Sequence, residues 1–252
     1  MKEIIAIVNR RGGVGKTATA HAIGAGLARR GYKTLFIDLD SQCNLTFDVG
    51  GKTAPIGSLE VLRGSATAKE AIQHAAGGDI IPASKRLSTA DKIIDGKGKE
   101  YRLRDALAPI TAAYDYIIID TPPALGVLTV NALTASNSTI IPARPEVHSI
   151  HGIQLLYEAI SAVKRYTNPN ITIKGILITH YNQRSNLCKD MKSNLEEAAK
   201  DLGTKVFSTP IRTCTAIAEA QALQTDIYSY SPRSNGAADY KALIDEITNK
   251  ER

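Results

Sequence analysis

A short glycine-rich segment follows the first apolar run of the sequence and has the composition of a phosphate-binding loop. Ile4–Val8 leads into residues 9–17, which read NRRGGVGKT, and a helical pattern begins directly after them. Glycines let backbone N–H groups converge on a phosphate, and the amino end of a helix adds positive partial charge. In such a loop Lys16 would reach the β- and γ-phosphates of a nucleotide, and the Thr17 hydroxyl would ligate Mg²⁺. The alternative is a glycine turn that only caps a helix.

The loop departs from the common pattern G-x-x-x-x-G-K-T, because Arg10 stands where the first glycine belongs. A strand before the loop and a helix after it nevertheless favour nucleotide binding over a bare turn. The predicted nucleotide contacts in this segment are Gly12, Gly13, Val14, Gly15, Lys16, Thr17 and Ala18.

Carboxylates follow two further strand candidates. Asp38 and Asp40 close the run that begins at Thr34, and Asp120 closes Tyr116–Ile119. Alternation puts Asp38 and Asp40 on one side of their strand, at the carboxyl end, where parallel sheets bind ligands. A carboxylate there holds Mg²⁺ or orients an attacking water, and a capping or turn role is the alternative. The predicted metal-site residues are Thr17, Asp40 and Asp120.

Apolar runs of strand length alternate with helical patterns along the chain. The strand candidates are Ile4–Val8, Thr34–Leu39, Ile80–Ile81, Tyr116–Ile119, Thr139–Ile141, Ile173–Thr179 and Val206–Phe207. The helix candidates are 17–30, 100–112, 149–166, 185–202, 214–223 and 235–248. Continuous apolar strands joined by helices predict an α/β fold, with a mostly parallel twisted sheet between two helical layers. Residues 84–104 are expected to form a surface loop, and 41–70 to be the least regular region.

Composition narrows the class of protein. The chain has 252 residues, of which 43% are hydrophobic, so residues 1–252 are expected to form one domain. No apolar stretch is long enough for a membrane span, and no secretory signal is recognisable. Three widely spaced cysteines indicate a reducing compartment, so we expect a cytoplasmic protein. The net charge of +6 permits an anionic partner without requiring one.

These motifs together resemble one family. Residues 9–17 resemble the deviant Walker A loop K-G-G-x-G-K-[ST] of the ParA/MinD ATPases, within the SIMIBI class of P-loop proteins. Residues 38–44 match the switch motif D-x-D-P-Q-x-N except for its proline, and 114–123 match Y-D-Y-I-I-I-D-x-P-P. The family motif E-A-P-S reads Glu-Ala-Gln-Ala at 219–222. The resemblance runs from residue 4 to about 247 and implies a three-layer P-loop fold with ATP and Mg²⁺ as cofactors.

The resemblance also implies roles for single residues. In this family the extra lysine of the loop reaches the nucleotide of the partner in an ATP-bound dimer, and here Arg11 takes its place. Arginine keeps the charge and offers a planar fork of donors, so Arg11 is expected to act in trans, with a solvated surface arginine as the alternative. By resemblance Asp40 orients the attacking water while Lys16 offsets phosphate charge. Asn182 and Pro210 are expected beside the adenine, although loop polarity and a turn proline would also explain them.

The family reading further implies a function. The chain looks like the short, ParA/Soj-like type that lacks an N-terminal helix-turn-helix domain and partitions plasmids or chromosomes. ATP would drive homodimerisation, the dimer would bind DNA without sequence preference at the nucleoid, and a ParB-type partner would stimulate a slow ATPase. Candidate cations for DNA are Arg184, Lys189, Lys192, Arg212, Arg233 and Lys241, with solvated helix faces as the alternative.

Three other functions compete with partitioning. A membrane-associated regulator of the MinD type would need a basic amphipathic C-terminal helix, whereas residues 240–247 resemble a helix packed on the domain. A reductase-type relative would hold an iron–sulfur cluster, but Cys43, Cys188 and Cys214 offer no convincing ligand pair. In the third alternative, the Arg11 form binds ATP as a slow switch without useful turnover.

Overall fold

The computed structural model of the chain describes residues 3–146 and 148–248. One sheet runs through it, with strands β1 (Glu3–Ile7), β2 (Thr34–Asp38), β3 (Gln73–Ala75), β4 (Gly78–Ile81), β5 (Tyr116–Asp120), β6 (Ser138–Ala143) and β7 (Thr172–Ile178). Their order in space is β3-β4-β2-β5-β1-β6-β7, and only the β3–β4 pair is antiparallel among the pairs of this sheet. The predicted mostly parallel sheet is confirmed, and the predicted domain of 1–252 includes six residues beyond those described, together with residue 147.

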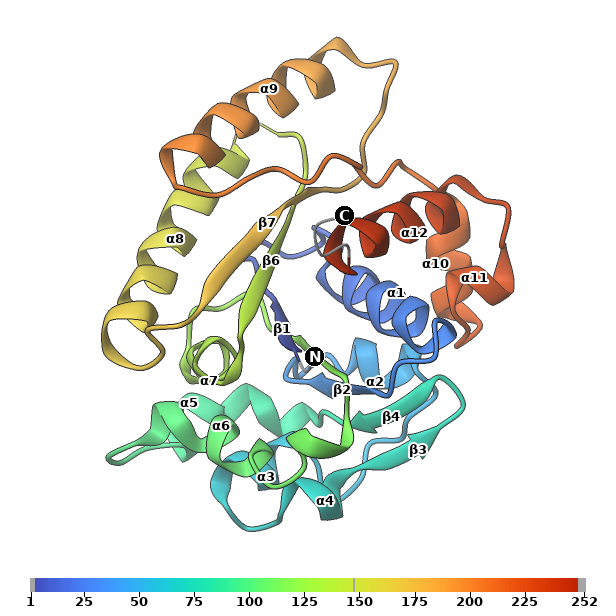
Figure 1. The fold of residues 1–252 in the computed structure, drawn as a ribbon. Coiled ribbons are helices and arrows are strands. Elements are labelled where there is room, and N and C mark those ends of the chain that lie inside the picture. The colour runs from blue at the N-terminus through green and yellow to red at the C-terminus, as the bar shows by residue number, and fades with distance from the viewer. Residues whose placement is uncertain (1–2, 147, 249–252) are drawn as a thin grey trace.

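Helices cover both faces of this sheet, as Figure 1 shows. One layer contains α1 (Lys16–Arg29), α2 (Asn44–Asp48), α10 (Thr215–Ala222), α11 (Ile227–Tyr230) and α12 (Asn235–Thr248). The other contains α3 (Ser58–Arg63), α4 (Ala68–Ala71), α5 (Ala90–Ile93), α6 (Arg102–Leu107), α7 (Val127–Ala135), α8 (His148–Tyr166) and α9 (Asn186–Asp201). The predicted three-layer α/β/α architecture is therefore confirmed.

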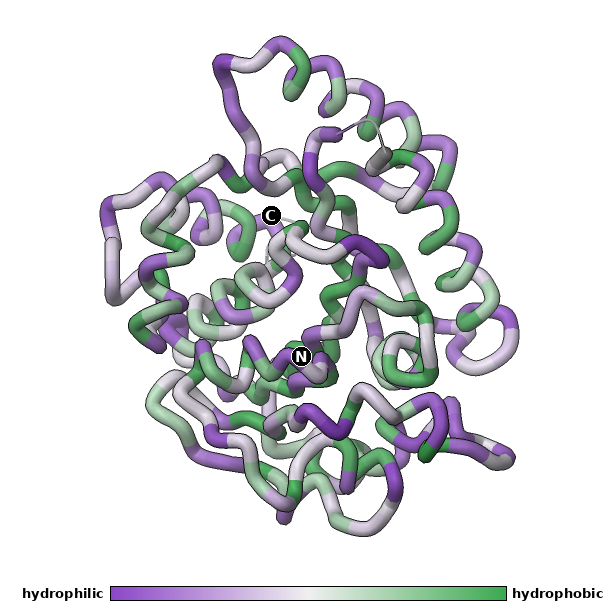
Figure 2. The backbone as a smooth tube through the Cα atoms, turned by 180° about the vertical axis from the view of Figure 1, so that it is seen from behind, coloured by the Kyte–Doolittle hydropathy of each residue, from purple (hydrophilic) through white to green (hydrophobic). Residues whose placement is uncertain are grey.

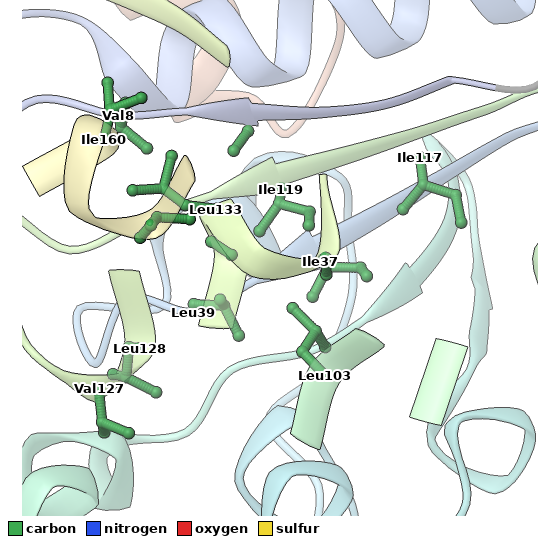
Figure 3. Packing of buried hydrophobic residues seen from close by; sticks show 14 of the residues in the cluster. Val8, Ile37, Leu39, Leu103, Ile117, Ile119, Val127, Leu128, Leu133 and Ile160 are labelled. Carbon is green, nitrogen blue, oxygen red and sulfur yellow. The ribbon is translucent and has the colours of Figure 1, made fainter. Parts of the chain in front are cut away.

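Successive residues of each buried strand pack against opposite helical layers. Ile37, Ile117 and Ile119 belong to the cluster of Figure 3, which they form with residues such as Leu103 and Leu133. Phe36 and Ile118, one position along, belong instead to the cluster that includes residues of α1 and α12. Because both faces are covered, β2 and β5 are apolar along their middle positions, Leu35–Ile37 and Ile117–Ile119, instead of alternating with polar residues. In Figure 2 the colour alternates along the outer helices, such as the long α9, and these keep one hydrophilic face.

Three local predictions were wrong. Val206–Phe207 is not a strand: Ile176 of β7 forms a bridge with Val206, and Pro210 soon follows, which has no N–H to continue a ladder. The predicted surface loop at 84–104 contains α5 and two short 3₁₀ helices, Lys85–Thr89 and Lys99–Tyr101. The single helix expected at 100–112 is divided between the second of these, α6, and a third 3₁₀ turn at Thr111–Ala113. Such short helices carry too few turns for a hydrophobic period to reveal them.

The described part of the chain contains no helix that is long and apolar enough to cross a membrane.

A buried histidine lies on the sheet-facing side of α1. His21 is 4% exposed, its Nε2 has no hydrogen-bond partner among the described residues, and its ring packs edge-on against Phe36. Burial without a partner disfavours the charged imidazolium and lowers the pKa of His21 to about 4. The unfolded chain therefore binds a proton here at a pH at which the folded protein does not.

This difference predicts a pH-dependent effect of the substitution His21→Leu. Below pH 6.5 the unfolded state of the unaltered protein gains a proton that the folded state refuses, so its stability falls as the pH is lowered. The variant has no such histidine. Its free energy of unfolding, relative to that of the unaltered protein, should therefore rise by about 2 kcal/mol when the pH is lowered from 7 to 5. Urea unfolding at both pH values measures the change, with exposed His151→Leu as the control. A His21→Leu difference that stays constant with pH would contradict the prediction.

Candidate nucleotide-binding site

The side chain of Asn9 fixes the start of the loop between β1 and α1 by two hydrogen bonds. Asn9 Nδ2 donates to the Pro142 carbonyl at 2.6 Å, and Asn9 Oδ1 accepts from the Arg11 N–H at 2.9 Å. Gly13 and Gly15 have φ of +69° and +84°, values that favour glycine. No side chain caps the amino end of α1, so its first N–H groups remain available for an anion.

A second brace comes from the end of β7. Thr179 Oγ1 donates to the carbonyl of Val14 at 2.9 Å and lies 3.3 Å from that of Ala143. This ties the loop to the strands on which it rests, and Thr179 also lines the cavity described below. Thr179 was missed in the sequence, where its position at the end of an apolar strand was the available signal.

The lysine of the loop is buried and points inward. Lys16 is 7% exposed, and its Nζ donates to the Arg11 carbonyl at 3.0 Å. Burial lowers the pKa of Lys16, while the carboxylates of Asp120 and Asp40 oppose that shift. The ammonium is thus a desolvated cation held among carboxylates, which suits it to an anionic ligand.

Asp120 lies behind the loop at the end of β5. It is fully buried, and Thr17 Oγ1 donates to its Oδ2 at 2.6 Å. Burial, with the nearby charge of Asp38, raises the pKa of Asp120 well above its usual value. Asp120 of β5 lies directly beside Asp38 of β2 in the sheet register, so the negative charges of these two residues share one small region.

Asp38, the last residue of β2, and Asp40, two residues further on, have different roles. Asp38 is fully buried and accepts three hydrogen bonds: from the Asp40 N–H, the Thr46 N–H and the Thr46 hydroxyl. Burial nevertheless raises the pKa of Asp38 to about 6. Asp40 lies beyond the strand and lines the cavity, where its Oδ1 accepts from the Gln42 N–H at 3.0 Å. Asp38 therefore shapes the switch segment, and Asp40 is the carboxylate available to a ligand.

This donor set fits a magnesium ion. Magnesium prefers oxygen ligands and retains several waters, so a hydroxyl and one or two carboxylates suffice on the protein side. Thr17 and Asp40 line the same cavity, and Asp120 reaches it through the Thr17 hydroxyl. Surplus negative charge at Asp38 and Asp120 would be offset by a divalent cation.

These residues surround a cavity of about 410 Å³. Gly12, Gly13, Gly15, Lys16, Thr17 and Ala18 form one side of it. Other walls come from Asp40, Gln42 and Asn44, from Thr179 and His180, and from Ile211, Arg212, Thr213, Cys214, Ile217, Ala218, Gln221 and Tyr240. Val14 is buried beneath the loop and does not line the cavity. Asn182 and Pro210, expected beside a base, are also outside the lining, whereas the adjoining residues 211–213 belong to it.

Arg11 lies outside the lining of this cavity. Its guanidinium forms an ion pair with Glu146, which also lies 3.7 Å from Arg144. The Arg11 side chain is 45% exposed. Within a single chain, then, Arg11 is directed to the loop after β6, and it remains accessible to a second molecule.

The cations expected to contact DNA are not one patch. Arg184 precedes α9 and Lys189 lies on it, both exposed, while Lys192 of the same helix pairs with Glu196. Arg233 is exposed between α11 and α12. Figure 1 shows α9 and α11 on separate parts of the molecule.

Two further candidate cations have local contacts of their own. Arg212 lines the nucleotide cavity, and its guanidinium forms a bidentate pair with Asp239, so it differs from the exposed cations Arg184 and Lys189 near α9. Lys241 on α12 lies 5.9 Å from the centre of the Tyr228 ring.

Comparison with known proteins gives a consistent result. A family model described as an AAA domain matches residues 2–173. The chain is 37% identical over 252 residues to the sporulation initiation inhibitor protein Soj of Bacillus subtilis, with 98% of each chain covered. It is 35% identical over 253 residues to the chromosome partitioning protein ParA of Myxococcus xanthus, covering 98% of this chain and 88% of that one.

A solved structure supports the same assignment. The structure described as cobyrinic acid a,c-diamide synthase from Mycobacterium smegmatis, with bound ADP and magnesium, matches with a TM-score of 0.84 at 33% identity. The match covers 97% of this chain and 93% of that one. Taken with the deviant phosphate loop and its buried lysine, these matches show that the chain belongs to the ParA/MinD family of P-loop ATPases.

Proposed function

We propose that this protein is a partitioning ATPase that binds ATP and Mg²⁺, dimerises in the ATP-bound state and then binds DNA without sequence preference. The observation that carries the proposal is the placement of Lys16, Thr17 and Asp40 around one cavity. Relatives that are 35–37% identical over nearly the whole chain include a chromosome partitioning protein and Soj, which supports segregation of plasmids or chromosomes as the purpose of the cycle. In this proposal the protein acts on the nucleoid, and a ParB-type partner stimulates hydrolysis.

The residues around the cavity have distinct roles in this proposal. The amides of residues 12–18 bind the phosphates, and Lys16 offsets their charge near the bond that breaks. Thr17 and Asp40 would hold the metal together with Asp120, which acts through Thr17; when bound, the metal would polarise the terminal phosphoryl group. Asp40 also orients the water that attacks the γ-phosphate.

Arg11 is proposed to complete the site of the second subunit. Asn9 links its loop to Pro142 by hydrogen bonds, and the Arg11 side chain lies at the surface outside its own cavity. In a dimer the guanidinium would exchange its contact with Glu146 for the phosphates of the partner's nucleotide. Arginine makes a stronger, bidentate contact with phosphate than lysine does, so the dimer would retain the interaction that the family's lysine supplies.

Adenine is proposed to lie against the wall formed by residues 211–221. The two residues expected beside the base, Asn182 after β7 and Pro210 next to Ile211, lie outside the lining of this cavity. Contacts of those two residues with the nucleotide would require a movement of their loops.

DNA is proposed to bind at the start of α9. Arg184 and Lys189 are exposed there without a carboxylate partner among the described residues, and Lys192 follows one turn later on the same face. Nonspecific binding needs only several cations that face phosphates, and dimerisation brings together two copies of this surface. Arg233 would add a further contact, whereas Arg212 is held by Asp239 and would contribute less.

The experiment that tests this proposal is retention on DNA of random sequence in the presence of ATP. Exchanging Lys189 and Lys192 together for glutamate should lower retention at least about tenfold at about 0.1 M salt, since contacts with two phosphates are lost and repulsion is gained. The matched control makes the same change at Lys97 and Lys99, between α5 and α6, far from α9 in Figure 1. Equal retention by both variants would remove α9 from the DNA surface, and ATP-independent retention would contradict the proposed cycle.

The described part of α12 does not favour the membrane-associated alternative. The apolar residues of α12 that could enter a bilayer, Tyr240, Leu243, Ile244 and Ile247, are buried against α1 and the sheet. An iron–sulfur site also lacks support, since no group of three or more metal-ligating side chains occurs within 3–146 and 148–248.

A further inference from the structure

One wall of the nucleotide cavity carries a polar side chain that the proposed reaction does not use. Gln221, on α10, lines the cavity together with Ile217 and Ala218 of the same helix. Ile217 and Ala218 make this wall largely apolar, which suits the flat face of a purine base. A polar group in an otherwise apolar wall is typically what fixes the orientation of a ligand.

The amide of Gln221 is held in one orientation by a buried carboxylate. Its Nε2 donates to Oδ2 of Asp48 at 2.5 Å, and Asp48, the last residue of α2, is 4% exposed. Burial raises the pKa of Asp48 to about 6, so the group is ionised at pH 8 and accepts hydrogen bonds only. The amino group of Gln221 must therefore face Asp48.

The carbonyl oxygen of Gln221 is then the polar atom left for a ligand. Within the described residues this oxygen has no hydrogen-bond partner, and Gln221 lines the nucleotide cavity. Adenine carries an amino group on C6, which donates, whereas guanine carries an oxygen there, which accepts. A fixed carbonyl favours the first base and opposes the second.

We propose that Gln221 is a specificity-determining residue that selects a 6-aminopurine nucleotide, and that Asp48 is the positioning residue that holds its amide. The inference rests on the proposed function, because it requires the phosphates to occupy the loop at residues 12–17. The family motif has proline where this chain has Gln221, and a proline offers no such amide. The hydrogen bond between Asp48 and Gln221 therefore cannot form in a chain that has this proline.

The test compares the affinities of the full chain for ATP and GTP at pH 8 with Mg²⁺. Each nucleotide competes with a fluorescent, non-hydrolysable ATP analogue, which gives the ratio of the two dissociation constants. The unaltered protein should prefer ATP at least about tenfold, as expected for one hydrogen bond gained and one repulsion avoided. In Gln221→Leu the ratio should fall to within about threefold.

A second variant separates specificity from packing. In Asp48→Asn the new amide can donate to the carbonyl of Gln221, which frees the Gln221 amide to turn its amino group to the cavity. The preference for ATP should then also fall to within about threefold, although Gln221 itself is retained. Gln154→Leu on α8 and Asp95→Asn, both exposed positions outside the cavity, are matched controls that should keep the original ratio.

The outcomes distinguish this inference from the proposed function. Lys16→Ala should weaken ATP and GTP by similar factors, because it acts on the phosphates. If ATP binding depends on Lys16 but Gln221→Leu and Asp48→Asn both keep the tenfold preference, the role of Gln221 is overturned and the function stands. If the unaltered protein binds neither nucleotide, both are overturned.

Discussion

Replacing Asp40 by alanine should slow ATP hydrolysis at least about a hundredfold, while ATP still binds. Asp40 lines the cavity, and its carboxylate makes one backbone contact, to the Gln42 N–H. Asp38 cannot take over the role of Asp40, since the Asp38 carboxylate is fully buried and accepts three hydrogen bonds. Loss of Asp40 thus removes the group that orients water and leaves the phosphate loop intact.

Steady-state ATPase assays measure the rate, and sizing of the protein with ATP, with ADP and without nucleotide measures its consequence. Without turnover the variant should accumulate as a dimer with ATP, whereas ADP should leave it monomeric because the γ-phosphate contacts are missing. The exposed substitution Asp95→Ala serves as the control. Hydrolysis at the normal rate in Asp40→Ala would show that another group positions the water.

Replacing Lys16 by alanine should weaken ATP binding at least about a hundredfold. Lys16 is 7% exposed, and the charges of Asp120 and Asp40 act on its ammonium, so it works in a poorly hydrated site where its attraction for phosphate is strong. In the variant a triphosphate would meet the charges of Asp40 and Asp120 with one compensating cation fewer.

Equilibrium titration with a fluorescent ATP analogue measures the affinity, and exposed Lys33→Ala, outside the cavity, is the control. Thermal unfolding of both variants checks that the fold is kept. Affinity that stays within about threefold of the unaltered protein would contradict the assignment of the loop at residues 9–17.

Much of the site was readable from the sequence because its parts are local. The loop, its glycines and the start of α1 are contiguous, so spacing alone predicts their geometry. Asp120 was found because it ends a buried strand, and parallel strands bring their carboxyl ends to one edge of the sheet. The three-layer fold was predicted correctly because its long strands and helices have clear hydrophobic patterns. A helix as short as α5, with four residues, has too few residues to show such a pattern.

Contacts between distant segments could not be read in this way. Asp38 and Asp40 look alike in the sequence, and only packing against Thr46 makes one of them structural. The pairing of Arg11 with Glu146 and of Asp48 with Gln221 joins residues that are 135 and 173 positions apart.

Local patterns along this chain thus determined the phosphate loop, its lysine and the acidic strand ends, because hydrophobic periodicity and glycine geometry act over a few residues. Tertiary structure decided which polar group each of those residues faces. The burial of an atom and the charges around it depend on distant segments that the fold brings together, and a short-range sequence pattern contains no information about those segments.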